Sequence, residues 1–267
     1  GGSGFIGSNL VDYYVNLDYK VLNLDISSPR NKEYFDNWLE TDITNYSNTR
    51  NSILGFEPDY IVHLAARTDL EGESIEDYEA NTNGVKNVMS IIKELKSLKK
   101  IVITSSMLVN QLGYKPNSQM DFNPNTIYGE SKVITEKNVW NNLPQCDWCI
   151  IRPTSIWGPF FDEPYRNFFD IIIRNKYFHI RGNITKKTYG FVGNSVFQID
   201  KILFSNTRDS SNKIFYIGDN PEINIEDWAD EIAGQLGNKI MKLPFSVIKL
   251  ASYFGDFLKL FGINFPL

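Results

Sequence analysis

The chain has 267 residues, of which 42% are hydrophobic and 22% are charged, and its net charge is −5. This composition is typical of a soluble globular protein and excludes a disordered one. The acidic balance, with basic runs no longer than Lys99-Lys100 and Lys186-Lys187, argues against a nucleic-acid-binding surface. No apolar run reaches the roughly 18 residues that a membrane-spanning helix needs, so we expect no membrane span.

The chain begins with a glycine-rich turn, Gly1-Gly2-Ser3-Gly4-Phe5-Ile6-Gly7, and a helical pattern follows it at about 8–17. Glycine at positions 1, 4 and 7 allows a tight turn and a close approach of the backbone to a pyrophosphate. The N-terminus of the following helix favours the phosphate charge. A dinucleotide-binding turn normally follows a strand, so we expect a Val/Ile-rich strand before Gly1 in a longer natural chain.

Asp25 lies about 20 residues after the glycines, at the end of the apolar run 21–25. A carboxylate at this place accepts hydrogen bonds from the adenosine ribose and repels a 2′-phosphate, which favours NAD as the cofactor. Arg30 lies nearby and leaves NADP open. Asp42-Ile43 follows a second extended stretch at 38–41, where an acid and an apolar side chain can contact an adenine.

Short apolar runs and helical patterns alternate through the first half of the chain. Continuous apolar runs are typical of strands that are buried on both faces. Their alternation with helices predicts an α/β fold with a doubly wound, Rossmann-like parallel sheet. Strands are expected at 21–25, 61–66, 101–104 and 149–152, and helices at about 8–17, 47–54, 75–98 and 125–142.

Tyr128 and Lys132 form the sharpest motif, because a spacing of four places both on one face of a helix. A free phenol has a pKa near about 10, and positive charge from Lys132 and an oxidised nicotinamide would favour the phenolate. Ser106 ends the strand before them, at the edge where a parallel sheet meets its ligand. We predict that Ser106, Tyr128 and Lys132 are catalytic; a capping serine and an ordinary surface tyrosine and lysine are the alternative.

Cys146 and Cys149 have the C-x-x-C spacing of a redox pair, but Trp148-Cys149-Ile150-Ile151 is typical of a buried strand with cysteine as a small apolar side chain. Two thiolates are too few for a structural zinc site unless a histidine joins them. We expect reduced cysteines, no metal, and a cytoplasmic protein.

The pattern becomes less regular after Pro159. We expect an NAD(P)-binding domain over 1–159 and a mainly substrate-binding lobe of mixed α/β elements over 160–267. Within this lobe the sequence predicts strands at 188–192 and 214–217, a helix at 224–236 capped by Asn224, and an amphipathic helix at 244–261. We expect the last helix to pack against the lobe or a partner; binding to a membrane surface is the alternative.

Several motifs occur in order along residues 1–159. They are Gly1/Gly4/Gly7, Asp25, Asp42-Ile43, His63-Leu64-Ala65-Ala66, Asn81 in Asn81-Thr82-Asn83-Gly84, Thr104-Ser105-Ser106, Tyr128 with Lys132, and Arg152-Pro153 with Trp157-Gly158-Pro159. Together they resemble the extended short-chain dehydrogenase/reductases of the NAD-dependent epimerase/dehydratase family. Later stretches, Phe191-Val192-Gly193-Asn194 and Phe215-Tyr216-Ile217-Gly218-Asp219, match more loosely.

The resemblance implies a Rossmann domain with a smaller lobe for a nucleotide sugar, and a homodimer through the helices near 75–98 and 125–142. It implies Ser106, Tyr128 and Lys132 as the catalytic trio. The residues implied to bind the cofactor are Gly1, Gly4, Phe5, Ile6, Gly7, Asp25, Asp42, Ile43, Leu64, Ala65, Ala66, Asn81, Thr104, Tyr128, Lys132 and Pro153. Those implied to bind the substrate are Ser106, Ser155 and Lys187.

The sequence also departs from the family pattern. Dehydratases of the family have an Asp-Glu pair after the catalytic hydroxyl, whereas this chain has Met107-Leu108, which can act as neither acid nor base. Asn110-Gln111 replaces the usual Tyr-Gly. Ser155 stands where many sugar-nucleotide enzymes have Asn, and Lys187 where many have Arg.

We therefore expect an NAD(P)-dependent enzyme of polysaccharide biosynthesis that acts on a secondary hydroxyl of a nucleotide sugar, as an epimerase or reductase rather than a dehydratase. One alternative is an enzyme like the 3β-hydroxysteroid dehydrogenases or a sugar 4-keto reductase. A second alternative is a non-catalytic NAD(P)-binding regulator.

Overall fold

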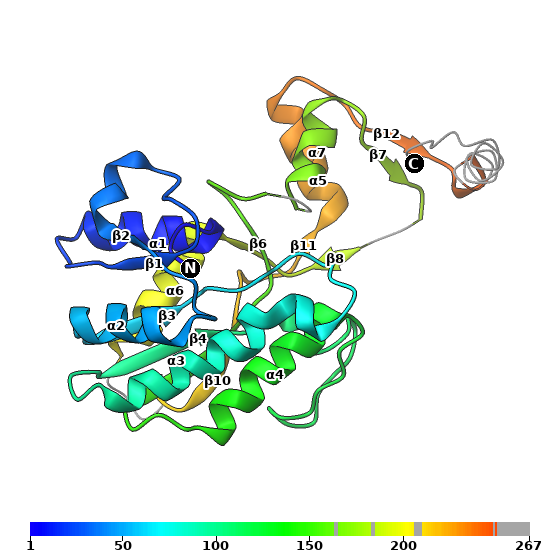
Figure 1. Cartoon of the computed structure of the whole chain (residues 1–267). Coiled ribbons are helices and arrows are strands. Elements are labelled where there is room, and N and C mark those ends of the chain that lie inside the picture. Colours follow the sequence, from blue (N-terminus) through cyan, green and yellow to red (C-terminus); the bar gives the residue numbers. More distant parts are fainter. Residues whose placement is uncertain (163–164, 183–184, 206–209, 248, 250–267) are drawn as a thin grey trace. The chain divides into compact units, whose positions relative to one another are not determined.

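The computed structural model describes residues 1–162, 165–182, 185–205, 210–247 and 249 (Figure 1). The chain divides into two compact units. The first unit consists of Gly1–Asp162 and Tyr189–Asp219, and the second of Glu163–Thr188 and Asn220–Leu267. Residues 189–219 therefore lie with the first unit, whereas we expected a single boundary at 159.

The first unit is built around a four-stranded parallel sheet with the strand order β10-β5-β4-β3. The strands are β3 (Tyr60–His63), β4 (Lys100–Thr104), β5 (Asp147–Pro153) and β10 (Lys213–Ile217). This confirms the predicted parallel α/β fold. The outer strand β10 comes from the second half of the chain and pairs with β5 residue by residue, which explains why residues 189–219 return to the first unit.

Two further parallel pairs belong to the same unit. They are β1 (Asn23–Asp25) with β2 (Trp38–Glu40), and β6 (Ser155–Trp157) with β9 (Tyr189–Phe191). A cavity of about 570 Å³ separates β1 from β3, and its walls include Leu24 and Val62. Its lining contains none of Ser106, Tyr128 and Lys132, so this space is distinct from the predicted catalytic site.

Helices connect these strands and cover both faces of the sheet (Figure 1). They are α1 (Phe5–Val15), α2 (Tyr46–Phe56), α3 (Val85–Ile91), α4 (Ile127–Asn141) and α6 (Val192–Phe204). Short 3-10 turns occur at η1 (Lys32–Asn37) and η5 (Met107–Val109).

The continuous helix expected at 75–98 is interrupted. It consists of the 3-10 turn η2 (Ile75–Tyr78), the π-helical turn η3 (Ala80–Gly84), α3, and the 3-10 turn η4 (Ile92–Glu94). The wide turn η3 contains Asn81, whose side chain bonds to groups outside the helix. Such turns commonly occur near functional sites.

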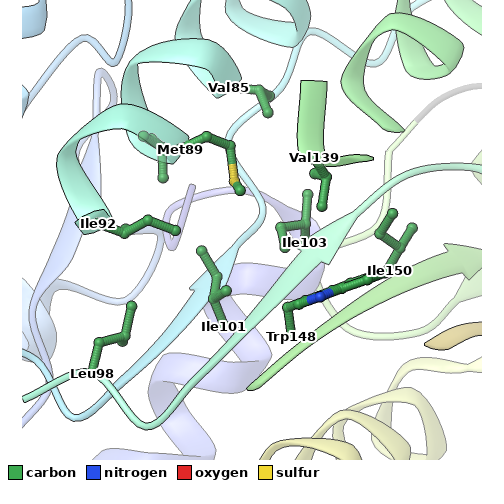
Figure 2. Close-up of a cluster of buried hydrophobic side chains, with 10 residues drawn as sticks. Val85, Met89, Ile92, Leu98, Ile101, Ile103, Val139, Trp148 and Ile150 are labelled. Carbon is green, nitrogen blue, oxygen red and sulfur yellow. The ribbon is translucent and has the colours of Figure 1, made fainter. Parts of the chain in front are cut away.

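The core lies on both faces of the four-stranded sheet, because alternate residues of a strand point to opposite faces. On one face Ile101, Ile103 and Ile150 pack against Met89 of α3 and Val139 of α4 (Figure 2). On the other face, the buried cluster combines β4, β5 and β10 with α1 and α6. It contains Leu10, Val102, Cys149, Ile151, Val196, Ile199, Ile202, Leu203 and Ile217. Cys149 is a buried free thiol of this core.

The second unit has its own small core of Ile172, Ala229 and Ala233. Its elements are α5 (Tyr165–Ile173), β7 (Phe178–Ile180), β8 (Lys186–Lys187), β11 (Ile223–Asn224), α7 (Ile225–Gln235) and β12 (Met241–Leu243). The predicted cap of α7 is present, since the side chain of Asn224 accepts a hydrogen bond from Glu226 N at 3.2 Å. The amphipathic helix predicted at 244–261 falls mostly on residues 248 and 250–267, outside the described residues.

Candidate functional site

The glycine turn leads directly into α1 and leaves no room for side chains. A Cβ on Gly1 would lie 2.2 Å from Ala65 N, and one on Gly7 would lie 2.1 Å from Gly1 O. No side chain caps the N-terminus of α1, where Gly4 is the N-cap residue. The first N–H groups of α1 therefore have no side-chain acceptor, as an anion-binding helix N-terminus requires.

Asp25 ends β1 beside this turn. Its carboxylate accepts hydrogen bonds from Ser3 N at 3.0 Å and from Ser27 N at 2.9 Å, and its side chain is 13% exposed. Arg30, which left NADP open in the sequence, donates to Ser3 O at 3.3 Å and forms an ion pair with Asp162 at 2.6 Å. The guanidinium is thus already engaged by a carboxylate.

Three other predicted cofactor residues have partners within the protein. Asp42 accepts from the N–H and the hydroxyl of Thr44, so it closes a turn on the surface. Ile43 is buried against Gly84, where a Cβ would meet its side chain at 2.6 Å. Asn81 is fully buried and its side-chain amide bonds to Arg67 N, Arg67 O and the Ser131 hydroxyl, so it holds the loop after β3 against α4.

The predicted catalytic trio lies on α4 and at the end of β4. Lys132 is 2% exposed, and its Nζ donates to Thr104 O at 3.1 Å. The same Nζ lies 6.0 Å from the centroid of the Tyr128 ring. Ser106 is 7% exposed, and its hydroxyl accepts a hydrogen bond from Leu108 N at 3.1 Å. The Lys132–Thr104 bond therefore ties the helix that carries Tyr128 to the strand that leads to Ser106.

Gly129 allows α4 to approach the serine segment closely. A Cβ at this position would lie 2.3 Å from Leu108 O, so the helix touches η5 backbone to backbone. The N-terminus of α4 is capped by Thr126, whose hydroxyl accepts from Gly129 N at 3.0 Å. These contacts fix the position of Tyr128 relative to Ser106.

Burial determines the charge state of two groups near the site. It lowers the pKa of Lys132 to about 8, and the negative charge of Glu136 opposes this shift. It also lowers the pKa of His63 to about 3, with the charge of Lys132 as the second cause. His63 is therefore neutral at physiological pH, whereas Lys132 remains mostly protonated.

A buried ion pair that sequence reasoning missed lies beneath the trio. Glu136 and Arg152 form two hydrogen bonds of 2.8 Å each. The Ser105 hydroxyl also donates to Glu136 at 2.6 Å. A signal existed in the sequence, since Glu136 follows Tyr128 and Lys132 at the same spacing of four and therefore lies along the same side of α4.

Arg152 extends this network toward the loop between Ser106 and Tyr128. It donates to Gln119 O at 2.8 Å and to the Tyr216 hydroxyl at 3.0 Å. One guanidinium thus binds α4, β10 and the loop at once, and all of these contacts lie in the first unit.

The remaining predicted residues are distributed over both units. Leu64, Ala65 and Ala66 follow β3, Phe5 and Ile6 begin α1, and Pro153 ends β5. Ser155, in β6, is fully buried, and its hydroxyl has no hydrogen-bond partner among the described residues. Lys187 belongs to β8 of the second unit, and burial lowers its pKa.

Among the described residues, no group of three or more His, Cys, Asp or Glu side chains is arranged to hold a metal ion. No helix in that part of the chain has the length and apolar character needed to cross a membrane.

The chain is similar to known enzymes in sequence and in fold. A model of the NAD dependent epimerase/dehydratase family matches residues 1–203. The N-acetyl-alpha-D-glucosaminyl-diphospho-ditrans,octacis-undecaprenol 4-epimerase of Escherichia coli O157:H7 is 28% identical over 267 residues, covering 97% of this chain and 78% of that enzyme. The 3-beta-hydroxysteroid dehydrogenase of Mycolicibacterium neoaurum is 25% identical and covers 92% and 71% of the two chains.

The UDP-glucose 4-epimerase of Mycolicibacterium smegmatis is 30% identical, but the match covers 60% of this chain and only 55% of that enzyme. Among solved structures, WbmG of Bordetella bronchiseptica in complex with NAD and UDP has a TM-score of 0.74 at 18% identity, with 91% of this chain and 79% of that chain covered. The UDP-glucose 4-epimerase of Thermotoga maritima has a TM-score of 0.72 at 20% identity, with 91% and 84% covered.

Proposed function

Because the chain belongs to the NAD-dependent epimerase/dehydratase family, we propose that it oxidises and re-reduces a secondary hydroxyl of a sugar carried on a diphosphate, with Tyr128 as the proton-transfer group. The observation that carries this proposal is the buried Lys132, bonded to Thr104 O beside the Tyr128 ring and next to the strand end that bears Ser106. The family is NAD-dependent, in agreement with the cofactor expected from Asp25.

The residues at the glycine turn fit this cofactor. At Gly1 and Gly7 any Cβ would collide with neighbouring backbone, and α1 begins without a side-chain cap. A pyrophosphate would bind to these N–H groups. When bound, NAD supplies a hydride acceptor for the alcohol carbon. The Asp25 carboxylate lies beside the same turn, where it is suited to the adenosine ribose.

The chain's own side chains handle the proton. Tyr128, as the phenolate, takes the proton of the substrate hydroxyl at its phenolic oxygen and returns it after the reverse step. The charge of Lys132 favours the phenolate, because a nearby cation stabilises the ionised form. The Ser106 hydroxyl orients the substrate oxygen. His63 stays neutral and adds no second charge to this region.

The same site favours epimerisation or reduction over dehydration. Met107 and Leu108 form η5 directly after Ser106, and neither side chain carries an acid or base for the elimination of water. In an epimerase, the keto-sugar turns over and receives the hydride on its other face, so no cofactor is consumed. In a reductase, one cofactor is consumed for each turnover.

A diphosphate-linked sugar is the substrate class that the relatives support best. Nucleotide sugars and polyprenyl-diphosphate sugars share this group, and relatives named for each are similar to this chain. Ser155 and Lys187 are the proposed substrate contacts, as the family resemblance implies. The second candidate is oxidation of a steroid-like hydroxyl, which similarity to a 3-beta-hydroxysteroid dehydrogenase favours.

A homodimer through α3 and α4 is part of the proposal. Large apolar side chains more than two fifths exposed occur at many places in the described chain, but none of them lies on α3 or α4. Exposed positions on these helices carry Lys86, Ser90, Glu130 and Lys137. A contact there would be polar and wet rather than a continuation of the core.

The proposal is tested with Tyr128→Phe, which removes the proton-transfer oxygen and keeps the ring. Turnover of UDP- and polyprenyl-diphosphate-linked N-acetylhexosamines should fall by at least about a thousandfold, whereas NAD binding, measured by calorimetry, should be unchanged. Tyr114→Phe is the matched control, since Tyr114 donates to Asp121 on the surface loop. Unchanged turnover in Tyr128→Phe would contradict the mechanism.

A further inference from the structure

The two-stranded sheet of β7 and β12 has one face that the core of the second unit does not use. His179 is buried and its Nε2 lies 2.9 Å from a carboxylate oxygen of Asp230 on α7, so that face of β7 turns toward the helix. Strand residues alternate between faces. Phe178 and Ile180 therefore turn to the opposite face, where the parallel register places Met241 and Leu243 beside them.

This second face is apolar and partly open to solvent, because Phe178, Ile180 and Leu243 are half-buried and Met241 is exposed. Met241 is 68% exposed, although it follows Ile240, which packs on the core of the second unit. Large apolar side chains that are about half exposed or more also flank the two strands: Ile173 and Leu236 before them, and Phe245 and Val247 after β12. Exposed apolar side chains on and next to two paired strands are typical of a surface that meets an apolar medium.

Basic side chains surround the same strands. Arg174, Lys176, Arg181 and Lys239 are all exposed, and none of them forms an ion pair within the described residues. The segments 171–182 and 236–247 contain no Asp or Glu, although the whole chain has a net charge of −5. Positive charge is therefore concentrated where the apolar side chains are exposed.

We propose that this basic-apolar face, made by the exposed residues of 171–182 and 236–247 other than Lys242, docks the second unit on the surface of an anionic lipid bilayer. Apolar side chains enter the boundary between headgroups and acyl chains, while long basic side chains keep their charges at the lipid phosphates. Each basic residue near such a surface strengthens binding by about fivefold. The two kinds of side chain are thus complementary to the two layers of the same partner.

Other occupants fit this face less well. A two-fold contact between copies of the chain would bring two sets of four positive charges together, which opposes association. A nucleic acid would match the charges, but its phosphate backbone offers no apolar surface for Met241 and Phe245. The bilayer surface satisfies both requirements.

This inference rests in part on the proposed function, because a sugar diphosphate carried on a polyprenol would be found at a bilayer surface. Docking itself needs no turnover, so vesicle binding tests it separately. An enzyme that is active on soluble nucleotide sugars but does not bind vesicles would leave the proposed function intact and overturn the docking.

The test is sedimentation of the full chain with phosphatidylcholine vesicles that contain or lack phosphatidylglycerol. The protein should bind only the anionic vesicles, and added salt should weaken binding. Lys176→Glu with Lys239→Glu should weaken it by at least about 25-fold. Met241→Glu with Phe245→Glu should also abolish binding, by removing the apolar contact.

Matched controls come from the first unit. Leu112 is 67% exposed, and Lys96 and Lys115 are exposed as well, so Leu112→Glu and Lys96→Glu with Lys115→Glu should bind vesicles as the wild type does. Circular dichroism and NAD binding verify that each variant is folded. Failure of the wild type to bind anionic vesicles at low salt would overturn the proposal. Equal losses of vesicle binding in the second-unit variants and in the first-unit controls would overturn it as well. The proposal would also be overturned if the wild type self-associates in the absence of vesicles and Met241→Glu abolishes this self-association. That result would favour a contact between copies of the chain.

Discussion

The guanidinium of Arg152 holds the carboxylate of Glu136 through two hydrogen bonds of 2.8 Å, and both side chains are at most 1% exposed. Glu136 belongs to α4, which carries Tyr128 and Lys132, and it also accepts from Ser105 at the end of β4. One buried pair therefore connects the two elements on which the proposed catalytic groups lie. The pair holds these two elements rigidly in place, because separating it would leave a buried charge without a partner.

Breaking this pair from one side should be costly. Glu136→Gln or Arg152→Met should each lower the free energy of unfolding by about 3–5 kcal/mol, because the remaining partner is left charged or unbonded in the core. Replacing both partners with apolar residues, as in Glu136→Leu with Arg152→Met, should recover much of this loss. Urea denaturation of the wild type, the single variants and the double variant measures the coupling.

The surface provides the control for that experiment. Arg50 and Glu94 form a similar two-point pair, with contacts of 2.9 and 2.6 Å, but their side chains are 40% and 38% exposed. Glu94→Gln should cost no more than about 1 kcal/mol. Equal losses from Glu94→Gln and Glu136→Gln would show that burial does not determine the cost.

Lys132 should give the protein a characteristic dependence on pH. Burial lowers its pKa from 10.5 to about 8, so between these values the unfolded chain binds more protons than the folded chain. The contribution of this group to stability therefore rises with pH across the window from about 8 to 10.5 and is smallest at neutral pH. Lys132→Met should lack this rise, so the stability difference between variant and wild type should change by about 3 kcal/mol from neutral pH to pH 10.5.

The measurement is a series of urea denaturation curves for both proteins at matched pH values. Other groups titrate in the same range, but they do so in both proteins and cancel in the difference. In the proposed reaction, turnover should also decline above about pH 8, where Lys132 loses the charge that supports the Tyr128 phenolate. A constant stability difference over this range would contradict the lowered pKa.

Gly129 should be intolerant of even one methyl group. Its Cβ would lie 2.3 Å from Leu108 O, so Gly129→Ala must move α4 away from the serine segment. We expect the free energy of unfolding to fall by about 1–3 kcal/mol. Turnover should fall by more than this loss of stability alone would cause, because Tyr128 and Ser106 separate. Gly55→Ala in α2 is the control, since nothing lies within 4 Å of its Cβ, and it should stabilise the protein by about 0.5–1 kcal/mol. Wild-type turnover in Gly129→Ala would show that this close approach has no role.

The sequence predicted the strands, helices and side-chain pairs that depend on a local residue pattern. Apolar runs with the periodicity of strands predicted β3, β4 and β5 as a parallel sheet, and the spacing of four placed Tyr128 beside Lys132 on α4. The Glu136–Arg152 pair could not be read in the same way, because its members lie 16 residues apart on a helix and a strand. Their meeting depends on the packing of α4 against the sheet.

Two departures have equally physical causes. The side chain of Asn81 forms hydrogen bonds with Arg67 and Ser131. These contacts exist only once the loop after β3 has packed against α4. The wide turn η3 that contains Asn81 interrupts the expected helix. The return of β10 to the first sheet depends on its pairing with β5, a long-range contact that periodicity does not encode.

The strand expected before Gly1 remains a proposal, and the cavity between β1 and β3 gives it a test. β1 pairs only with β2, and β3 only with β4, among the described residues, so both present an open edge to a cavity of about 570 Å³ lined by side chains such as Leu10 and Ile53.

An extension of five Val, Leu and Ile residues before Gly1 should therefore form a central parallel strand. Burial of these side chains contributes about 2 kcal/mol each, and ordering each residue costs about 1.5 kcal/mol, so the protein should gain roughly 2 kcal/mol in stability. A Gly/Ser extension of equal length is the control and should gain nothing, because it has no apolar side chains to bury. Urea denaturation of both proteins measures the effect. Equal stability of the two extended chains would show that the cavity between β1 and β3 does not accept a strand.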